Sequence, residues 1–409
     1  MYMAKNYSAI SRKWHIYFEN MQETFFQRLD RVINEWNRNY PEDAIDWVES
    51  TPNCTAKEEN LRRIQLREKL MRNGIIDDKI ARRWIPSVKA DENGYPIEPL
   101  SSEKEVTDPS LSSGEERTRE NILKFCASLK LNGNQTETLL HTVFFCRSFN
   151  LKNHFELVCY FYISRDSNEK NWYEKAKGFL VRNDLESIPY QEPEEVIFTQ
   201  EILTDVDAIS TEDALVEYIR DHFSIFAKEN QYITAKDCVD TDVSMCWKIV
   251  VREVVEEPDY ASEYAGTLSA GDRKKPFDIN AVEMAKLLQV IIGHTIDRKV
   301  PIKKYDEGLL PERIHKNFPT AAILQDICSG KENSMDRIRK SLILLSFYIW
   351  CTRENTKKTC HELINARLQD ANLPELCEYD LYDALFMYAA ANKKPLDTFR
   401  EIMLQAKPG

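Results

Sequence analysis

Large apolar residues recur every three or four positions near the start of this 409-residue chain, and that spacing is typical of an amphipathic helix. The recurring residues are Trp14, Phe18, Met21, Phe25, Leu29, Val32 and Trp36. They fall on one face of a helix and predict a helix over about 7–37. We expect this stripe to pack inside its own domain. The alternative is a seam for a partner protein or a homodimer, built from Trp14, Phe18, Met21 and Phe25.

Helical patterns continue along the chain, so the sequence predicts a predominantly α, multi-helical protein of two or three domains. A length of 409 residues allows this at ~100–200 residues per domain. Only 11 glycines are present, which argues against a glycine-rich all-β design. The one strand-like piece is the β-branched run at 245–257. The expected parts are an N-terminal helical segment with a basic helix (1–86), a mobile linker (87–117), a middle helical domain (118–271) and a C-terminal helical domain (272–409).

Several helix ends are marked by capping residues and by glycine or proline. Gly74 separates two expected helices within 55–86. Asn132 and Gly133 indicate a stop and a restart. Ser334 and Asp380 are typical N-caps, and Pro395 suits a first helical position.

The distribution of charge and cysteine bears on compartment and partners. The net charge is −12, yet 191–271 alone carries −14 and 272–409 carries +3, so any contact with a polyanion is expected near the ends of the chain. No apolar run reaches the ~18 residues of a membrane span, and the N-terminus lacks a signal peptide. The ten cysteines form no C-x-x-C pair and fit reduced core thiols. We therefore predict a cytoplasmic protein without a membrane contact.

The strongest basic run lies between Arg62 and Arg83. It holds eight Lys or Arg residues against three acids. Clustered cations release counterions when they bind a phosphate backbone, which makes this run a candidate nucleic-acid contact. The alternative is a solvated helix face. The candidate residues are Arg62, Arg63, Arg67, Arg82 and Arg83.

No complete catalytic or metal-binding signature is present, and no cofactor is predicted. The chain lacks nucleotide-binding glycine loops and a serine nucleophile elbow. The sequence His361-Glu362 lacks the second histidine of a zinc helix, because position 365 is Asn. We predict no metal site and expect a protein that is not an enzyme.

One short pattern resembles a nuclease motif. Pro258-Asp259 precedes Asp272-Arg273-Lys274, which is similar to the P-D…D-x-K spacing of the restriction-endonuclease-like family. The resemblance implies that Asp259 and Asp272 hold Mg²⁺ while Lys274 helps the attacking water. The alternative is a polar loop.

Residues 318–345, FPTAAILQDICSGKENSMDRIRKSLILL, contain a short helix pattern, Gly-Lys, a cap and a second helix pattern. This order resembles the second half of a lambda-repressor-like helix-turn-helix. The resemblance implies that Thr320, Gln325 and Ser329 face base edges and that Lys331 faces a phosphate. A purely structural helix pair is the alternative.

These observations favour a cytoplasmic regulatory or adaptor protein that acts by macromolecular binding, with double-stranded DNA as one expected partner. The first alternative is a protein-interaction scaffold or dimer that uses the 14–36 stripe. The second is a metal-dependent, nuclease-like enzyme that uses Asp259, Asp272 and Lys274.

Overall fold

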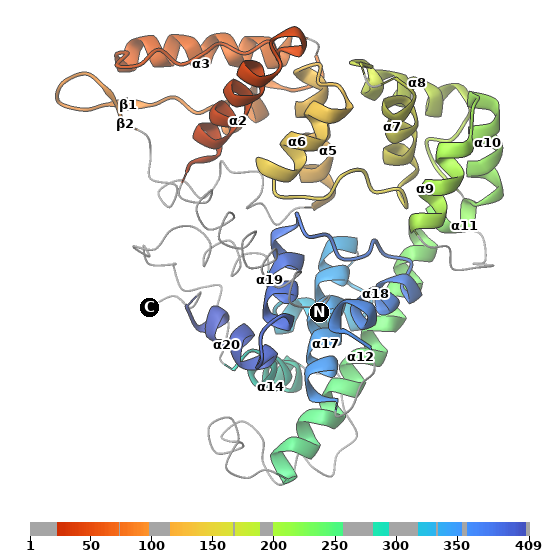
Figure 1. Ribbon diagram of the computed structural model, residues 1–409. Coiled ribbons are helices and arrows are strands. Elements are labelled where there is room, and N and C mark those ends of the chain that lie inside the picture. Colours follow the sequence, from red (N-terminus) through yellow and green to blue (C-terminus); the bar gives the residue numbers. More distant parts are fainter. Residues whose placement is uncertain are drawn as a thin grey trace.

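The computed structural model describes residues 23–72, 74–97, 115–166, 168–188, 199–256, 281–293, 318–332, 334–353 and 358–405. Helices dominate these residues (Figure 1), and the sheet found in them is a single antiparallel pair of short strands. The prediction of a predominantly α protein is therefore confirmed.

The first half of the chain builds one hydrophobic core, here called the N-terminal lobe, from α2 to α11. Its elements are α2 (Phe25–Asn39), the 3₁₀ helix η1 (Pro41–Asp43), α3 (Ala56–Met71), α4 (Asp78–Trp84), β1 (Lys89–Ala90), β2 (Pro96–Ile97), α5 (Glu115–Ser128), α6 (Gly133–Thr142), α7 (His154–Arg165), α8 (Trp172–Arg182), α9 (Thr199–Ala208), α10 (Glu212–Asp221) and α11 (Phe223–Phe226). Aromatic rings fill its centre, where Trp84 packs edge-on against Phe125 with ring centroids 4.7 Å apart.

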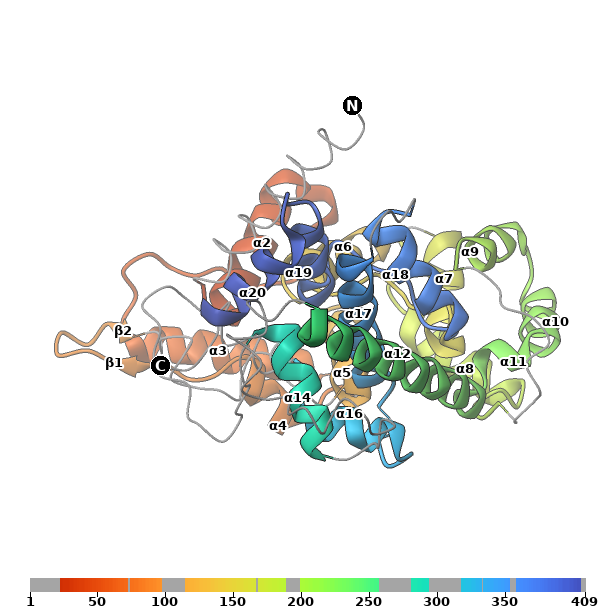
Figure 2. The same ribbon diagram turned by 90° about the horizontal axis from the view of Figure 1, so that it is seen from below.

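The second half builds another core, here called the C-terminal lobe. Its helices are α12 (Lys228–Glu256), α14 (Ala281–Ile292), α16 (Ala321–Cys328), α17 (Met335–Thr352), α18 (Cys360–Asp370), α19 (Leu381–Ala390) and α20 (Pro395–Gln405). The central helix is α17, because every residue from Ser341 to Ile349 is buried. It packs along α12, and Figure 2 shows α12 running past α14 and α16 on the other side.

Phe145 joins the two lobes by packing. Phe145 follows α6 in the N-terminal lobe, yet its buried ring belongs to the core of the C-terminal lobe. Arg28 of α2 lies over that ring, with its guanidinium carbon 4.7 Å from the ring centroid, and donates from Nε to the Val143 carbonyl at 3.0 Å. Phe145 adopts a φ of +50°, so the backbone turns sharply where the ring enters the other lobe.

The predicted helix over 7–37 is wrong at Thr24. That residue is extended, with φ −62° and ψ 159°, and is the N-cap of α2. Its side chain accepts from the Gln27 amide, and the Gln27 side chain accepts in return from the Thr24 amide, which completes a capping box. The helix therefore begins at Phe25, and the stripe is not one continuous helical seam. Residues 1–22, including Trp14, Phe18 and Met21, lie outside the described residues.

The strand expected at 245–257 is also wrong as far as it is described, because 245–256 belong to α12. The run is β-branched but forms part of a long helix in which Cys246, Trp247 and Val250 are buried, so packing outweighs local preference. The strand pair lies instead at 89–97, inside the segment expected to be a mobile linker. Of the rest of that linker, 98–114 fall outside the described residues and 115–117 form the start of α5.

Most predicted helix ends are confirmed by cap geometry. Ser334 accepts from the Arg337 amide, and Asp380 accepts from the Tyr382 amide. Asn132 caps α6 in a second capping box, and α20 begins at Pro395. Helix α10 ends at Asp221, and the single turn of α11 follows directly after His222.

The two cores divide the chain near α11 and α12, whereas the predicted boundaries lie at 87–117 and near 272. Elements on both sides of 87–117 share the core of the N-terminal lobe. The domain boundaries themselves stay predictions. Among the helices that the structure describes, none combines the length and apolar character that crossing a bilayer requires.

Candidate functional site

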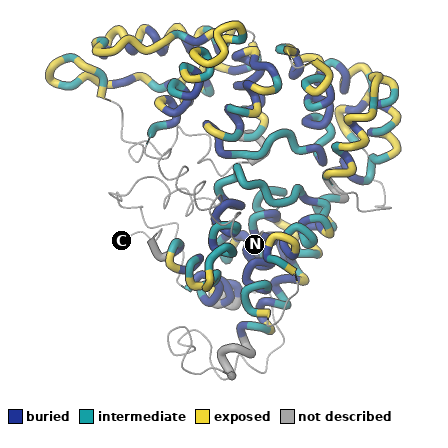
Figure 3. Tube along the Cα trace, in the orientation of Figure 1, coloured by how far each residue is buried: buried dark blue, intermediate teal, exposed yellow. Residues whose placement is uncertain are grey.

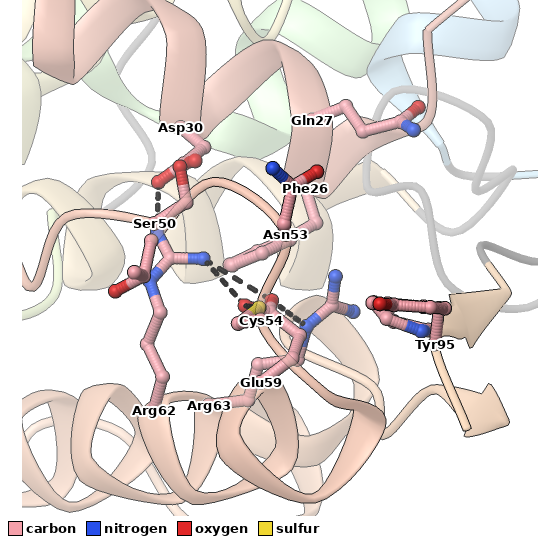
Figure 4. A pocket seen from close by; sticks show the side chains of 12 residues that line it. Phe26, Gln27, Asp30, Ser50, Asn53, Cys54, Glu59, Arg62, Arg63 and Tyr95 are labelled. Carbon is pink, nitrogen blue, oxygen red and sulfur yellow. Dashed lines mark hydrogen bonds and ion pairs between the residues drawn. The ribbon is translucent and has the colours of Figure 1, made fainter. Parts of the chain in front are cut away.

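A cavity of about 260 Å³ opens on the N-terminal lobe between α2, the turn at 50–54, α3 and the hairpin (Figure 4). Most of the residues that line it carry polar or charged side chains. The lining residues are Phe26, Gln27, Asp30, Ser50, Thr51, Asn53, Cys54, Glu59, Arg62, Arg63, Tyr95 and Pro96.

The floor of this cavity is a chain of four ionic side chains in alternating order: Asp30, Arg62, Glu59 and Arg63. Arg62 pairs with Asp30 through Nη2 and with Glu59 through Nη1, at 3.1 Å for the second contact. Arg63 Nε donates to Glu59 at 2.6 Å. The side chains of Glu59 and both arginines are at least nine-tenths buried, so the two positive and two negative charges compensate each other within the protein.

Backbone carbonyls and an aromatic ring hold the two arginines in place. Arg62 Nε donates to the Val48 carbonyl at 2.7 Å, and Arg63 Nη1 donates to the Pro86 carbonyl at 2.9 Å. Both guanidinium groups also lie over Phe26, with their carbons 5.3 and 4.0 Å from the ring centroid. Charge-assisted hydrogen bonds and ring contacts together make this floor rigid and preformed.

The rim is formed by the hairpin. Its turn is fixed by Asp91, whose Oδ1 accepts from the amides of Asn93 and Tyr95, both at 2.8 Å. Gly94 adopts a φ of +83°, a conformation that favours glycine, and its carbonyl accepts from the first amide of α3 at 2.9 Å. Tyr95 at the rim is 48% exposed, as is Ile97 two residues on.

The structure divides the predicted basic residues into two groups. Arg62, Arg63 and Arg67 are buried, and Arg67 lies beside the Ile85 carbonyl. Burial depresses the pKa of Arg67, since desolvation opposes its charge. Arg82 and Arg83 are exposed, and Arg82 pairs with Asp78 at 2.6 Å. In this conformation the first three arginines serve the fold and do not face a phosphate backbone.

The residues expected to contact DNA around α16 differ in their exposure to solvent. Thr320 is the N-cap of α16, and its hydroxyl accepts from the Ile323 amide. Gln325 is half-buried, while Ser329 and Lys331 are exposed on either side of Gly330, which has a φ of +74°. Helix α16 packs on α14 and α12, and α17 lies at the centre of the C-terminal lobe. The pair is therefore part of a larger bundle, and its exposed residues around α16 are Ala322 near the start of the helix and 329–331 at its end.

The remaining predicted sites are largely outside the described residues. Asp259, Asp272 and Lys274 fall within 257–280, which the structure does not describe. Phe25, the last residue proposed for a partner or homodimer seam, is buried in the core of the N-terminal lobe.

All ten cysteines are free thiols. Burial raises the pKa of most of them, to about 12 for Cys146 and about 11 for Cys238. Such thiols are poor nucleophiles at neutral pH. Within the part of the chain that the structure describes, no group of three His, Cys, Asp or Glu side chains is arranged to hold a metal ion.

A second ionic cluster, which the sequence analysis missed, lies where the lobes meet. The loop after α6 faces the loop between α18 and α19 (Figure 1). Arg147 of the first loop donates to the Glu375 carbonyl at 3.2 Å and lies 3.4 Å from the Asp383 carboxylate. Across the same junction His141 stacks on Tyr379, with ring centroids 3.7 Å apart.

Asp380 belongs to this junction and has an unusual acidity. Burial and the neighbouring Asp383 carboxylate raise the pKa of Asp380 to about 6, while Arg339 and Arg147 act in the opposite direction. Its carboxylate caps α19. The signal in the sequence was the Asp380–Asp383 spacing at a helix start, but only the fold shows that arginines from α17 and from the α6–α7 loop meet it.

Comparison with known proteins gives no match: no family pattern, no characterised relative and no solved structure corresponds to this chain.

Proposed function

We propose that this protein is a non-enzymatic, cytoplasmic regulatory or adaptor protein that acts by binding another protein at the rim of the N-terminal cavity. The observation that carries the proposal is the placement of Tyr95 and Ile97. Both are roughly half exposed on a hairpin whose turn is held by hydrogen bonds, beside a preformed cavity of about 260 Å³.

Aromatic side chains at the edge of a pocket are typical anchors of protein interfaces. A fixed hairpin lowers the entropic cost of binding, because little has to become ordered. The ion network below favours binding over chemistry, since its acids and bases already pair with one another. The cytoplasmic location is supported by the ten free thiols.

The test is site-specific photo-crosslinking from the hairpin in the cells that make the protein. A benzophenone amino acid replaces Tyr95 in one variant and Tyr40 in a matched control, because both tyrosines are 48% exposed. We expect a discrete adduct from position 95 that is absent from position 40 and is lost when Ile97→Asp is added. The purified partner should then bind the Tyr95→Ala protein at least ~10-fold more weakly, about 1.4 kcal/mol. Equal adducts at both positions, or none at position 95, would contradict the proposal.

Duplex DNA is the second candidate partner, favoured by the exposed Ser329 and Lys331 at the end of α16 and by the exposed Arg82 and Arg83. Retardation of a labelled duplex at low salt, weakened by Lys331→Ala, would support it. The absence of retardation at the lowest salt that keeps the protein in solution would exclude it.

A further inference from the structure

Helix α3 buries charged side chains and exposes apolar ones. Its buried side carries arginines, whereas its outer side carries Leu61 and Ile64, which are 57% and 42% exposed. Two further exposed residues, Lys57 and Glu68, flank them. The spacing 57, 61, 64 and 68 has steps of four, three and four, which lays all four side chains along one line of the helix. Figure 3 shows the outer side of α3 exposed along its length, at the edge of the molecule.

The line faces directly away from the lobe. The inner side of α3 is formed by Glu59, Arg62, Leu66 and Leu70, all buried, and these residues lie about half a turn from Leu61 and Ile64. Within the part of the chain that the structure describes, neither Lys57 nor Glu68 has an ion-pair partner. The outer line thus consists of two unpartnered apolar residues between two unpartnered opposite charges.

This line is complementary to itself when a second copy runs in the opposite direction. In two antiparallel helices, residues face each other when their numbers add to a constant. The sum 61 + 64 equals 57 + 68, so one registration sets Leu61 against the second copy's Ile64 and Lys57 against the second copy's Glu68. Two-fold symmetry repeats each of these contacts. A parallel arrangement would instead place Lys57 against Lys57 and Glu68 against Glu68.

We infer that this protein forms a two-fold symmetric homodimer through the outer faces of two antiparallel α3 helices. The contact is small. A 16-residue helix is ~24 Å long, so two such helices bury less than the ~1,600 Å² of a standard interface. Self-association is therefore weak and reversible, and it weakens with salt because both ion pairs are exposed. This surface lies on the opposite side of α3 from the cavity, so the inference is independent of the proposed function.

The test is charge complementation in the full chain, followed by analytical ultracentrifugation from ~1 to ~200 μM, the range suited to an interface below standard size. The wild-type protein should shift with concentration from one chain of 47.9 kDa toward two. Lys57→Glu and Glu68→Lys should each weaken self-association at least tenfold, because each places like charges opposite one another twice. An equimolar mixture of the two variants should recover association, since every facing pair is then of opposite sign.

Two control substitutions test whether the change in self-association is specific to the outer line of α3. Leu61→Lys should abolish association, whereas Val181→Lys, at a residue 48% exposed on α8, should leave it unchanged. All substituted residues are exposed, so circular dichroism should confirm that each variant folds. A wild-type protein that stays monomeric at every concentration would overturn the inference. So would single variants that associate like the wild type, or a mixture that fails to recover association.

Discussion

Arg339 on α17 and Asp383 on α19 form a two-point ion pair in the core of the C-terminal lobe, with Nη1–Oδ1 and Nη2–Oδ2 distances of 2.8 and 2.6 Å. Arg339 also donates to the carbonyls of Pro374 and Glu375, both at 2.9 Å. The pair therefore fixes the loop that contacts the N-terminal lobe as well as joining two helices.

Replacing Asp383 by Asn should destabilise the protein strongly. Asp383 is fully buried, and its loss leaves the buried Arg339 and the partly buried Arg147 without their shared counter-charge. Breaking such a pair costs about 3–5 kcal/mol. Urea denaturation followed by tryptophan fluorescence measures the free energy of unfolding. The matched control is Asp397→Asn, at an exposed aspartate of α20, which should change the free energy of unfolding by less than ~0.5 kcal/mol. A loss below ~1 kcal/mol for Asp383→Asn would contradict the structural role.

The contribution of Asp380 to the free energy of unfolding should fall as the pH rises from about 4 to about 6. The folded protein raises the pKa of Asp380 from 3.8 to about 6, so the folded state holds this proton more tightly than the unfolded state does. Stabilisation from that proton is present at low pH and is lost as the pH rises through the folded pKa. The loss from this group is on the order of 2 kcal/mol.

The variant Asp380→Asn isolates this effect, because asparagine caps a helix as well as aspartate does but does not titrate. Denaturation curves of both proteins between pH 4 and 7.5 should show the wild type losing stability relative to the variant as the pH rises. A constant difference across that range would rule out the assignment.

Arg63 and Arg82, which both belong to the predicted basic run, should contribute differently to the stability of the fold. Arg63→Met should cost about 2–4 kcal/mol, because it breaks a buried ion pair and removes the donor to the Pro86 carbonyl. Arg82→Met should cost less than ~0.5 kcal/mol, because its pair with Asp78 is exposed. Thermal denaturation of both variants checks the contrast, and equal losses would show that Arg63 is not part of the buried network.

Two glycine-to-alanine changes should have opposite signs. A Cβ at Gly133, the first residue of α6, would clash with the Ile163 side chain of α7, so Gly133→Ala should cost about 1–3 kcal/mol. At Gly178 in α8 the nearest atom is the mobile end of Arg182, 3.3 Å away, and Gly178→Ala should stabilise by about 0.5–1 kcal/mol. Adding Ile163→Ala should reduce the cost at Gly133, which a double-mutant cycle measures. An unchanged cost would mean that the clash is not its cause.

Helix positions could be predicted from the sequence largely because caps are local. Ser334, Asp380 and Asn132 accept from amides two or three residues ahead, so a short stretch of sequence holds the whole signal. Thr24 carries the same signal with Gln27, whereas the apolar stripe that crosses it predicts a longer helix. Where a cap and a periodicity conflict, the cap decides where this helix begins.

The orientation of α3 could not be predicted, because apolar residues occur on both of its sides. Leu66 and Leu70 face inward, while Leu61 and Ile64 face outward. The arginines turn inward because Glu59 lies three and four residues before Arg62 and Arg63, and because carbonyls from 48 and 86 accept from them. Those carbonyls come from distant segments, and no local pattern reveals them.

The insertion of Phe145 has a consequence for any attempt to divide the protein. A fragment ending near α11 would carry this ring without the pocket that receives it, and a fragment starting at α12 would keep the pocket but lack the ring. Each fragment, produced alone, would expose apolar surface that is buried in the intact chain. Each should therefore aggregate more readily than the intact chain. Gene fusions and truncations that keep both halves on one polypeptide are therefore the ones that should stay in solution.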